Sequence, residues 1–168
     1  MECAEFITGI FMRISRVLET ALDGLTEDEI NRQPAPSCNS ISWMVWHLTR
    51  VQDMHIARLS GNEQVWIAEK WYEKFGRVAD PGDNGLRHKP EDLAIFNAPD
   101  AKTLLDYHYA ALEKTKQYTN KLSAEELDRA IDDERAPTVA LRLTAFISDN
   151  IQHAGQVAYL RGWIKSQN

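Results

Sequence analysis

The chain has 168 residues, of which 43% are hydrophobic and 26% are charged. These proportions are ordinary for a soluble globular protein, and the length suits one domain, so we expect a single domain over residues 1–168. The formal net charge is -6, and the sequence contains no basic block. This balance argues against non-specific nucleic-acid binding, which depends on lysine and arginine side chains that neutralise phosphates.

The sequence does not predict export or membrane insertion. The chain opens with Met-Glu-Cys-Ala-Glu, which is acidic where a signal peptide is basic. The apolar stretch from Phe6 to Met12 is too short to span a bilayer. The two cysteines, Cys3 and Cys38, form no CxxC pair and are too few for a disulfide framework. We therefore expect reduced thiols in a cytoplasmic protein without membrane contacts.

Helical periodicity of the apolar residues defines four long segments. They cover about residues 5–22, 40–59, 100–122 and 138–163. Ser40 suits the N-cap of the second segment, because its hydroxyl can accept a hydrogen bond from a free backbone N–H of the first turn. No β-strand pattern competes, so we expect an all-α fold and specifically a four-helix bundle.

The connection between the second and third segments, about residues 60–99, is long. Its first part, 63–75, is rich in aromatic residues and is expected to form a further short helix. Its second part, 76–90, is rich in Gly, Pro, Asp and Asn, which is typical of irregular loop. Long insertions in compact domains are often functional, so we expect a lid or a wall over one end of the bundle.

The two halves of the chain resemble each other weakly. Residues 25–30 (Leu-Thr-Glu-Asp-Glu-Ile) and 122–127 (Leu-Ser-Ala-Glu-Glu-Leu) each follow a long helix. Both have the capping-box spacing of Ser or Thr and a Glu three residues later, at Thr26 and at Ser123. This pattern predicts two helical hairpins, each with a short helical turn in its connection. Coincidence is the alternative, since capping patterns are common.

Three polar residues are expected on apolar helix faces. His47 lies beside Met44 and Val51 on the second helix, while Asp149 and His153 lie four residues apart on the fourth. Burying an unpaired charge is costly, and a divalent metal is one suitable partner. Two nitrogens and one carboxylate oxygen suit Zn²⁺, Ni²⁺, Fe²⁺ or Mn²⁺ and leave positions open for water or substrate.

From these residues alone, an alternative without a metal site remains. An Asp-x-x-x-His pair often occurs by chance, and a lone inward histidine is more often hydrogen-bonded in the core than bound to metal. The chain is then a plain helical interaction protein, in which Asp149 and His153 pair with each other or with an arginine.

The chain resembles the DinB/YfiT-like superfamily over nearly its whole length, because the order of the elements also agrees. The residues that carry the resemblance are Trp46-His47-Leu48 within Ser40–Asp53, Asp149-x-x-x-His153-Ala-Gly-Gln156, and Tyr159-Leu-Arg-Gly162. The resemblance implies a four-helix bundle whose metal site takes one His from the second helix and an acidic-or-His-x-x-x-His pair from the fourth. His47, Asp149 and His153 are thereby implied as ligands, with zinc or nickel as the metal.

The residue at position 149 distinguishes this chain from its relatives. Many members of the superfamily have His where this chain has Asp149. The branch that resembles mycothiol-dependent maleylpyruvate isomerase has a carboxylate there, usually Glu. Because Asp is one methylene shorter, the metal is expected to sit differently or to bind more weakly.

The resemblance also implies a function. It favours a metal-dependent enzyme that uses a low-molecular-weight thiol, such as mycothiol or bacillithiol, in S-transfer or isomerisation of a small-molecule substrate. The alternatives are a non-catalytic, stress-associated metal-binding module and a metal-dependent hydrolase. Gln156 is a candidate for a hydrogen bond to a metal ligand or to metal-bound water, and so for orienting the bound group; packing or a helix–helix hydrogen bond is the alternative. No catalytic general base stands out. The five tryptophans and the habit of the family favour a homodimer.

The sequence also predicts the environment of five further residues. His55 is expected near the metal ligands or in the core, His88 in solvent, and His108 partly exposed on the third helix. Arg58 is expected to form a salt bridge, with contact to an anionic substrate as the alternative. Gly155 is expected to permit a close approach between helices.

Overall fold

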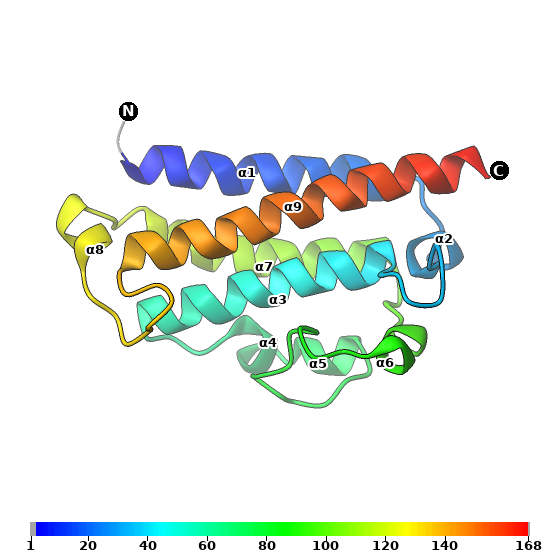
Figure 1. Cartoon of the computed structure of the whole chain (residues 1–168), viewed down its shortest axis with the longest axis horizontal. Coiled ribbons are helices and arrows are strands. Elements are labelled where there is room, and N and C mark those ends of the chain that lie inside the picture. Colours follow the sequence, from blue (N-terminus) through cyan, green and yellow to red (C-terminus); the bar gives the residue numbers. More distant parts are fainter. Residues whose placement is uncertain (1–2, 168) are drawn as a thin grey trace.

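The computed structural model describes residues 3–167, which form helices joined by loops (Figure 1). Within that range there is no β-strand, and the isolated bridge between Ala130 and Thr138 is not extended into one. The expected all-α fold is therefore confirmed. The bounds of the long helices differ from the expected ones by no more than three residues. These helices are α1 (Cys3–Leu22), α3 (Ile41–Ser60), α7 (Ala101–Thr119) and α9 (Val139–Ser166).

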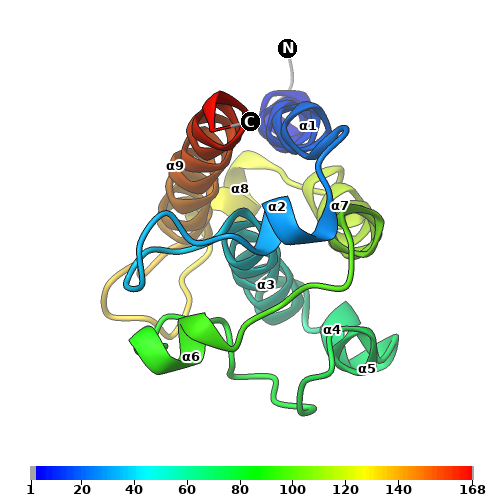
Figure 2. The same cartoon turned by 90° about the vertical axis from the view of Figure 1, so that its right-hand side faces the viewer.

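The four long helices pack in a closed ring, in which α1 and α3 each contact both α7 and α9. Figure 2, which looks along the bundle, shows them around a common interior. Helices α1 and α9 run in the same direction, and α3 and α7 run opposite to them (Figure 1). The largest side chains buried between the helices are Trp46, Trp66, Arg50, Tyr107, Phe11 and Phe146.

Side-chain caps fix where the helices begin. The hydroxyl of Ser40 accepts a hydrogen bond from the backbone N–H of Trp43 at 3.2 Å, as expected for the start of α3. That helix ends at Gly61, which has a φ of 71° and so adopts the left-handed conformation that favours glycine. Capping by Asp100 and Thr138 starts α7 and α9 in the same way.

The two expected helical turns are both present, as α2 (Glu27–Asn31) and α8 (Ala124–Asp128). The turn at α2 has a complete capping box, because the side chains of Thr26 and Glu29 each bond the other residue's backbone. At α8 only the bond to the Ser123 hydroxyl forms. The carboxylate of Glu126 instead bonds Arg129 and Tyr118, so it is not used to complete the box.

The segment between α3 and α7 holds three short helices, α4 (Val65–Ala68), α5 (Trp71–Lys74) and α6 (Pro90–Ala94). The single short helix expected over 63–75 is wrong, because Lys70 has a φ of 55° and interrupts it. The loop expected over 76–90 does precede α6. The whole segment lies along the outer side of α3 rather than over an end of the bundle (Figures 1 and 2). The segment, residues 61–100, therefore forms a side wall of the bundle and is named the wall segment.

No helix among the described residues combines the length and the apolar character needed to cross a membrane.

Candidate metal centre

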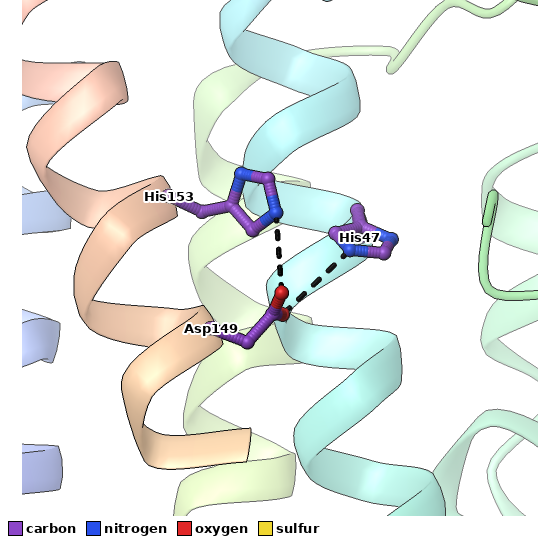
Figure 3. A group of neighbouring side chains, drawn as sticks. All are labelled: His47, Asp149 and His153. Carbon is purple, nitrogen blue, oxygen red and sulfur yellow. Dashed lines mark ion pairs between the residues drawn. The ribbon is translucent and has the colours of Figure 1, made fainter. Parts of the chain in front are cut away.

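His47 from α3 meets Asp149 and His153 from α9, as Figure 3 shows. Each residue offers one ligand atom, and the three atoms all lie within 4.8 Å of one another. Nε2 of His47 lies 3.7 Å from Oδ2 of Asp149, and Nε2 of His153 lies 3.6 Å from Oδ1. The packing of α3 against α9 thus joins residues that are about a hundred positions apart in the sequence. This group could hold a metal ion.

The two residues from α9 lie at the edge of its buried face. The side chain of His47 is 6% exposed, that of His153 is 17% exposed and that of Asp149 is 38% exposed. The fully buried stripe of α9 runs beside them, through Phe146, Asn150, Ala154 and Val157. The expected inward position is therefore correct for His47 and only partly correct for the α9 pair. The group lies at the seam between α3 and α9, where a small molecule can approach it.

Both imidazoles are held with Nε2 directed toward the carboxylate. Nδ1 of His47 is hydrogen-bonded to the backbone carbonyl of Asn84, and a carbonyl only accepts, so Nδ1 carries the proton. Nδ1 of His153 bonds Oε1 of Gln156 at 2.7 Å, which assigns the same tautomer. The lone pair of each Nε2 is then free for a metal. Gln156 therefore hydrogen-bonds one of the candidate ligands, which is one of the roles expected of it.

The carboxylate of Asp149 is suited to a cation. Its Oδ2 is buried and has no hydrogen-bond partner within residues 3–167, which is unfavourable unless a cation lies beside it. Burial raises the pKa of Asp149. The hydrogen bond and charge of His153, together with the charge of His47, lower it by a larger amount, so the net pKa lies below the usual value. One anionic oxygen donor and two imidazole nitrogens fit a divalent first-row metal ion.

The two histidines differ in their electrostatics. Burial lowers the pKa of His47 more than the bond to Asn84 raises it, so its net pKa lies below the ordinary value. Burial also lowers the pKa of His153, but the hydrogen bond and charge of Asp149 raise it above the ordinary value. Asp149 and His153 thus also form an ion pair when no metal is present, as the alternative from sequence requires.

The wall segment closes on His47 at Gly85. This residue has a φ of 85°, and a Cβ atom there would lie 2.6 Å from the ring of Trp43 and 2.9 Å from that of Trp46. Trp43 in turn stacks on His47, with ring centroids 4.7 Å apart and an angle of 9° between the planes. Only glycine allows both the backbone conformation and the close approach that bring the carbonyl of Asn84 to His47.

A buried arginine anchors the same segment. Arg50, on α3, donates hydrogen bonds to the backbone carbonyls of Pro81 at 3.0 Å and of Asp83 at 2.9 Å. Its charge is balanced by Asp53, whose carboxylate lies 3.4 Å away and also accepts bonds from the backbone of α4. The position of Asn84 is therefore fixed from within the core.

His88 does not face solvent as expected, since only 11% of its side chain is exposed. Its Nδ1 accepts a hydrogen bond from the indole N–H of Trp43 at 2.9 Å, and its Nε2 lies 3.2 Å from a carboxylate oxygen of Asp83. The ring also stacks on Trp46. The expectation failed because aromatic partners from α3 reach the loop, which its polar sequence did not indicate.

His108 was expected to be partly exposed and is instead fully buried, with Nδ1 3.3 Å from the hydroxyl of Thr49. Burial lowers its pKa to about 4. His55 stacks on Phe146 and lines a pocket beside Asp149. Arg58 pairs with Asp133 at 3.5 Å, which confirms the expected salt bridge.

Sequence reasoning missed Trp43, Asn84 and Gly85, which support His47. The run Asp83-Asn84-Gly85 is a turn signal, but a turn signal does not tell which residue its carbonyls will contact. The stacking of Trp43 on His47 was available from their spacing of four on one helix, which places the two side chains on the same face.

Comparisons with known proteins agree with this description. A model of the DinB superfamily matches residues 11–157. The chain is similar to the crystal structure of a conserved protein from Enterococcus faecalis, with a TM-score of 0.90 and 30% sequence identity, over 99% of each chain. No curated protein sequence matches.

Proposed function

The chain belongs to the DinB superfamily, and on that premise we propose that it binds a divalent metal, zinc or nickel, through His47, Asp149 and His153. The observation that carries the proposal is the meeting of three ligand atoms within 4.8 Å of one another. The tautomers set by Asn84 and Gln156 support it, as does Oδ2 of Asp149, which has no hydrogen-bond partner among the described residues.

We further propose that the protein is an enzyme that uses a low-molecular-weight thiol, as an S-transferase or an isomerase acting on a small molecule. A metal bound there would lower the pKa of a thiol and hold the thiolate. Three protein ligands leave room for such a group, and the partial exposure of Asp149 gives it access. His47 and His153 would be held in place by Asn84 and Gln156, without rearrangement.

Two alternatives remain from the sequence, a metal-dependent hydrolase and a metal-binding module without turnover. A hydrolase is favoured less, because the pocket supplies no effective general base. His55 lines it, but burial, together with the charges of Arg142 and Arg58, lowers the pKa of His55 to about 4. A thiol bound to metal needs no such base, since the metal itself favours the thiolate.

Thiol-dependent turnover distinguishes the proposed enzyme from a metal-binding module without turnover. Protein loaded with zinc or nickel is mixed with mycothiol, bacillithiol, glutathione or cysteine, and conjugation to monochlorobimane is followed by fluorescence. The proposal predicts turnover with at least one thiol that is lost in His153→Ala. If no thiol is turned over and none shifts thermal stability, the enzyme proposal fails and the module is favoured.

The surface between α1 and α9 supports a homodimer, which we also propose. Two adjoining hollows of about 690 and 700 Å³ run along this surface, with almost entirely apolar linings. Phe6 is 60% exposed there and Ile151 is 51% exposed. Exposed apolar side chains that gather on one face are suited to contact with a protein partner.

The charges on α1 favour a second copy of this chain as that partner. Glu5, Gly9 and Arg13 lie four residues apart along the hollow, so they share one face of the helix. If two copies of α1 pack antiparallel about a two-fold axis at Gly9, Glu5 of each faces Arg13 of the other. Apart from the neighbouring backbone of its own helix, no atom of residues 3–167 lies within 4 Å of a Cβ built at Gly9 or Gly155. Gly155 therefore permits no close approach within the chain, contrary to expectation, but leaves space for a partner.

The cysteines are consistent with a cytoplasmic location, which we retain as part of the proposal. Cys3 and Cys38 are both free and exposed. Exposed thiols persist in a reducing compartment.

A further inference from the structure

A small pocket adjoins the candidate metal centre. It has a volume of about 200 Å³ and lies between α3 and α9, with Asn84 and Leu86 of the wall segment along one side. His47 and Asp149 line one end, and the helices continue from them to His55 and Arg142. Arg142 and Asp149 are seven residues apart on α9, which is about 10 Å along the helix axis.

Arg142 gives the far end of the pocket a positive charge that its ion pair does not balance. Its guanidinium contacts Asp133 through Nη2, but the same carboxylate oxygen also pairs with Arg58 at 3.5 Å. One carboxylate is thus shared by two guanidinium groups. Nε of Arg142 is buried and has no hydrogen-bond partner within the described part of the chain. A buried cationic donor without an acceptor is unfavourable and is a good binding group for an anion.

His55 adds a second polar group at this end. Its ring stacks on Phe146, with centroids 5.3 Å apart, and neither ring nitrogen has a hydrogen-bond partner in residues 3–167. A neutral imidazole has one N–H to donate. Between the two ends, the lining that α3 and α9 supply is apolar, from Val51, Ala145 and Phe146. The pocket thus combines an apolar middle with polar donors at the end away from the metal ligands.

We propose that this pocket binds a small molecule with a terminal carboxylate, which Arg142 receives while the reactive end of the molecule faces His47 and Asp149. The inference rests on the proposed function, because it assigns the class of ligand to the same site. The volume of about 200 Å³ is below the roughly 300–1,000 Å³ typical of drug-sized ligands, so the ligand is a short-chain acid. The planar guanidinium suits a carboxylate in particular.

Two matched probes test the proposal, 6-mercaptohexanoate and 6-mercaptohexanol, which differ only in the terminal group. Their affinities for the zinc-loaded protein are measured by titration calorimetry, and zinc content is determined in the same samples. We expect the acid to bind roughly tenfold or more tightly than the alcohol, which is the effect of one hydrogen bond to a charged group. An acid that binds no more tightly than the alcohol overturns the proposal.

Arg58→Gln is the matched control for Arg142→Gln. Both changes remove a partner of Asp133, but Arg58 does not line the pocket. Arg142→Gln should abolish the preference for the acid, and Arg58→Gln should retain it; equal losses in the two variants contradict the assignment. Arg142→Lys, which keeps the charge and removes Nε, serves if the glutamine variant does not fold, and should weaken the preference.

The zinc content of the same samples distinguishes failure of the metal proposal from failure of the carboxylate proposal. If the protein retains no zinc, the proposed function fails, and hexanoate and hexanol are then compared on the metal-free protein. A preference for hexanoate that depends on Arg142 supports the carboxylate pocket without a metal. The absence of that preference overturns it.

Discussion

The substitution Gly85→Ala tests whether the wall segment supports the metal centre. An alanine with a φ of 85° costs about 1–2 kcal/mol relative to glycine, because its Cβ crowds the backbone. Its Cβ would also lie 2.6 Å from Trp43 and 2.9 Å from Trp46, both of which are buried. Overpacking of this kind typically costs about 1–3 kcal/mol more. If the segment stays in place, the protein loses about 2–5 kcal/mol of stability.

If the segment moves instead, Asn84 no longer bonds His47. Loss of a partner that orients a metal-bound histidine typically weakens metal binding by about 10–100-fold. Urea unfolding of the metal-free protein measures the first effect, and competition with a chelator for zinc measures the second. Either the stability or the zinc affinity must therefore fall.

Gly61→Ala is the matched control for this substitution. Gly61 also has a positive φ, of 71°, but apart from its chain neighbours no atom of the described residues lies within 4 Å of a Cβ built there. Gly61→Ala should lose only the stability that the positive φ costs an alanine, about 1–2 kcal/mol, and should bind zinc as the wild type does. Equal stability and equal zinc affinity in the two variants would show that the contacts at Gly85 do not hold Asn84 against His47.

Three further predictions concern other parts of the molecule. His153→Ala should abolish metal binding in a folded bundle, whereas Asp149→Glu should keep it and Asp149→Ala lose it; wild-type zinc affinity in His153→Ala would show that the ligand assignment is wrong. Burial holds the pKa of His108 at about 4, against 6.5 in the unfolded chain, so its contribution to stability is complete above pH 6.5 and is lost as the pH falls toward 4. Between pH 7 and pH 5, the free energy of unfolding of His108→Gln should therefore fall by about 2 kcal/mol less than that of the wild type, as measured by urea titrations with chelator. Equal falls in the two proteins would count against burial as the cause. Arg13→Glu should dissociate the dimer, and adding Glu5→Arg should restore it; sedimentation that shows a monomeric wild type, or no rescue, would exclude the α1 pairing.

The long helices could be predicted because their signals are local. Apolar periodicity and capping residues act within one or two turns of the chain, and the structure uses Ser40 as the expected N-cap. The positions of His47, Asp149 and His153 on helix faces followed from the same periodicity. Their meeting required the pairing of α3 with α9, for which the family resemblance was needed.

The wall segment could not be predicted, because its structure depends on distant contacts. Arg50 reaches it from the core, and His88 is buried by Trp43 and Trp46. A polar loop sequence predicts exposure unless such partners are known. The expected exposure of His108 was wrong for a similar reason, since the neighbours that bury it come from other helices, among them Thr49 of α3.

The most direct test of a metal centre at His47, Asp149 and His153 is elemental analysis of the protein purified without a histidine tag. We predict close to one zinc or nickel per chain, and a lower thermal stability after treatment with a chelator, because a ligand that binds only the folded state stabilises it. Protein that contains no metal, and whose thermal stability is unchanged by the chelator, would contradict the account.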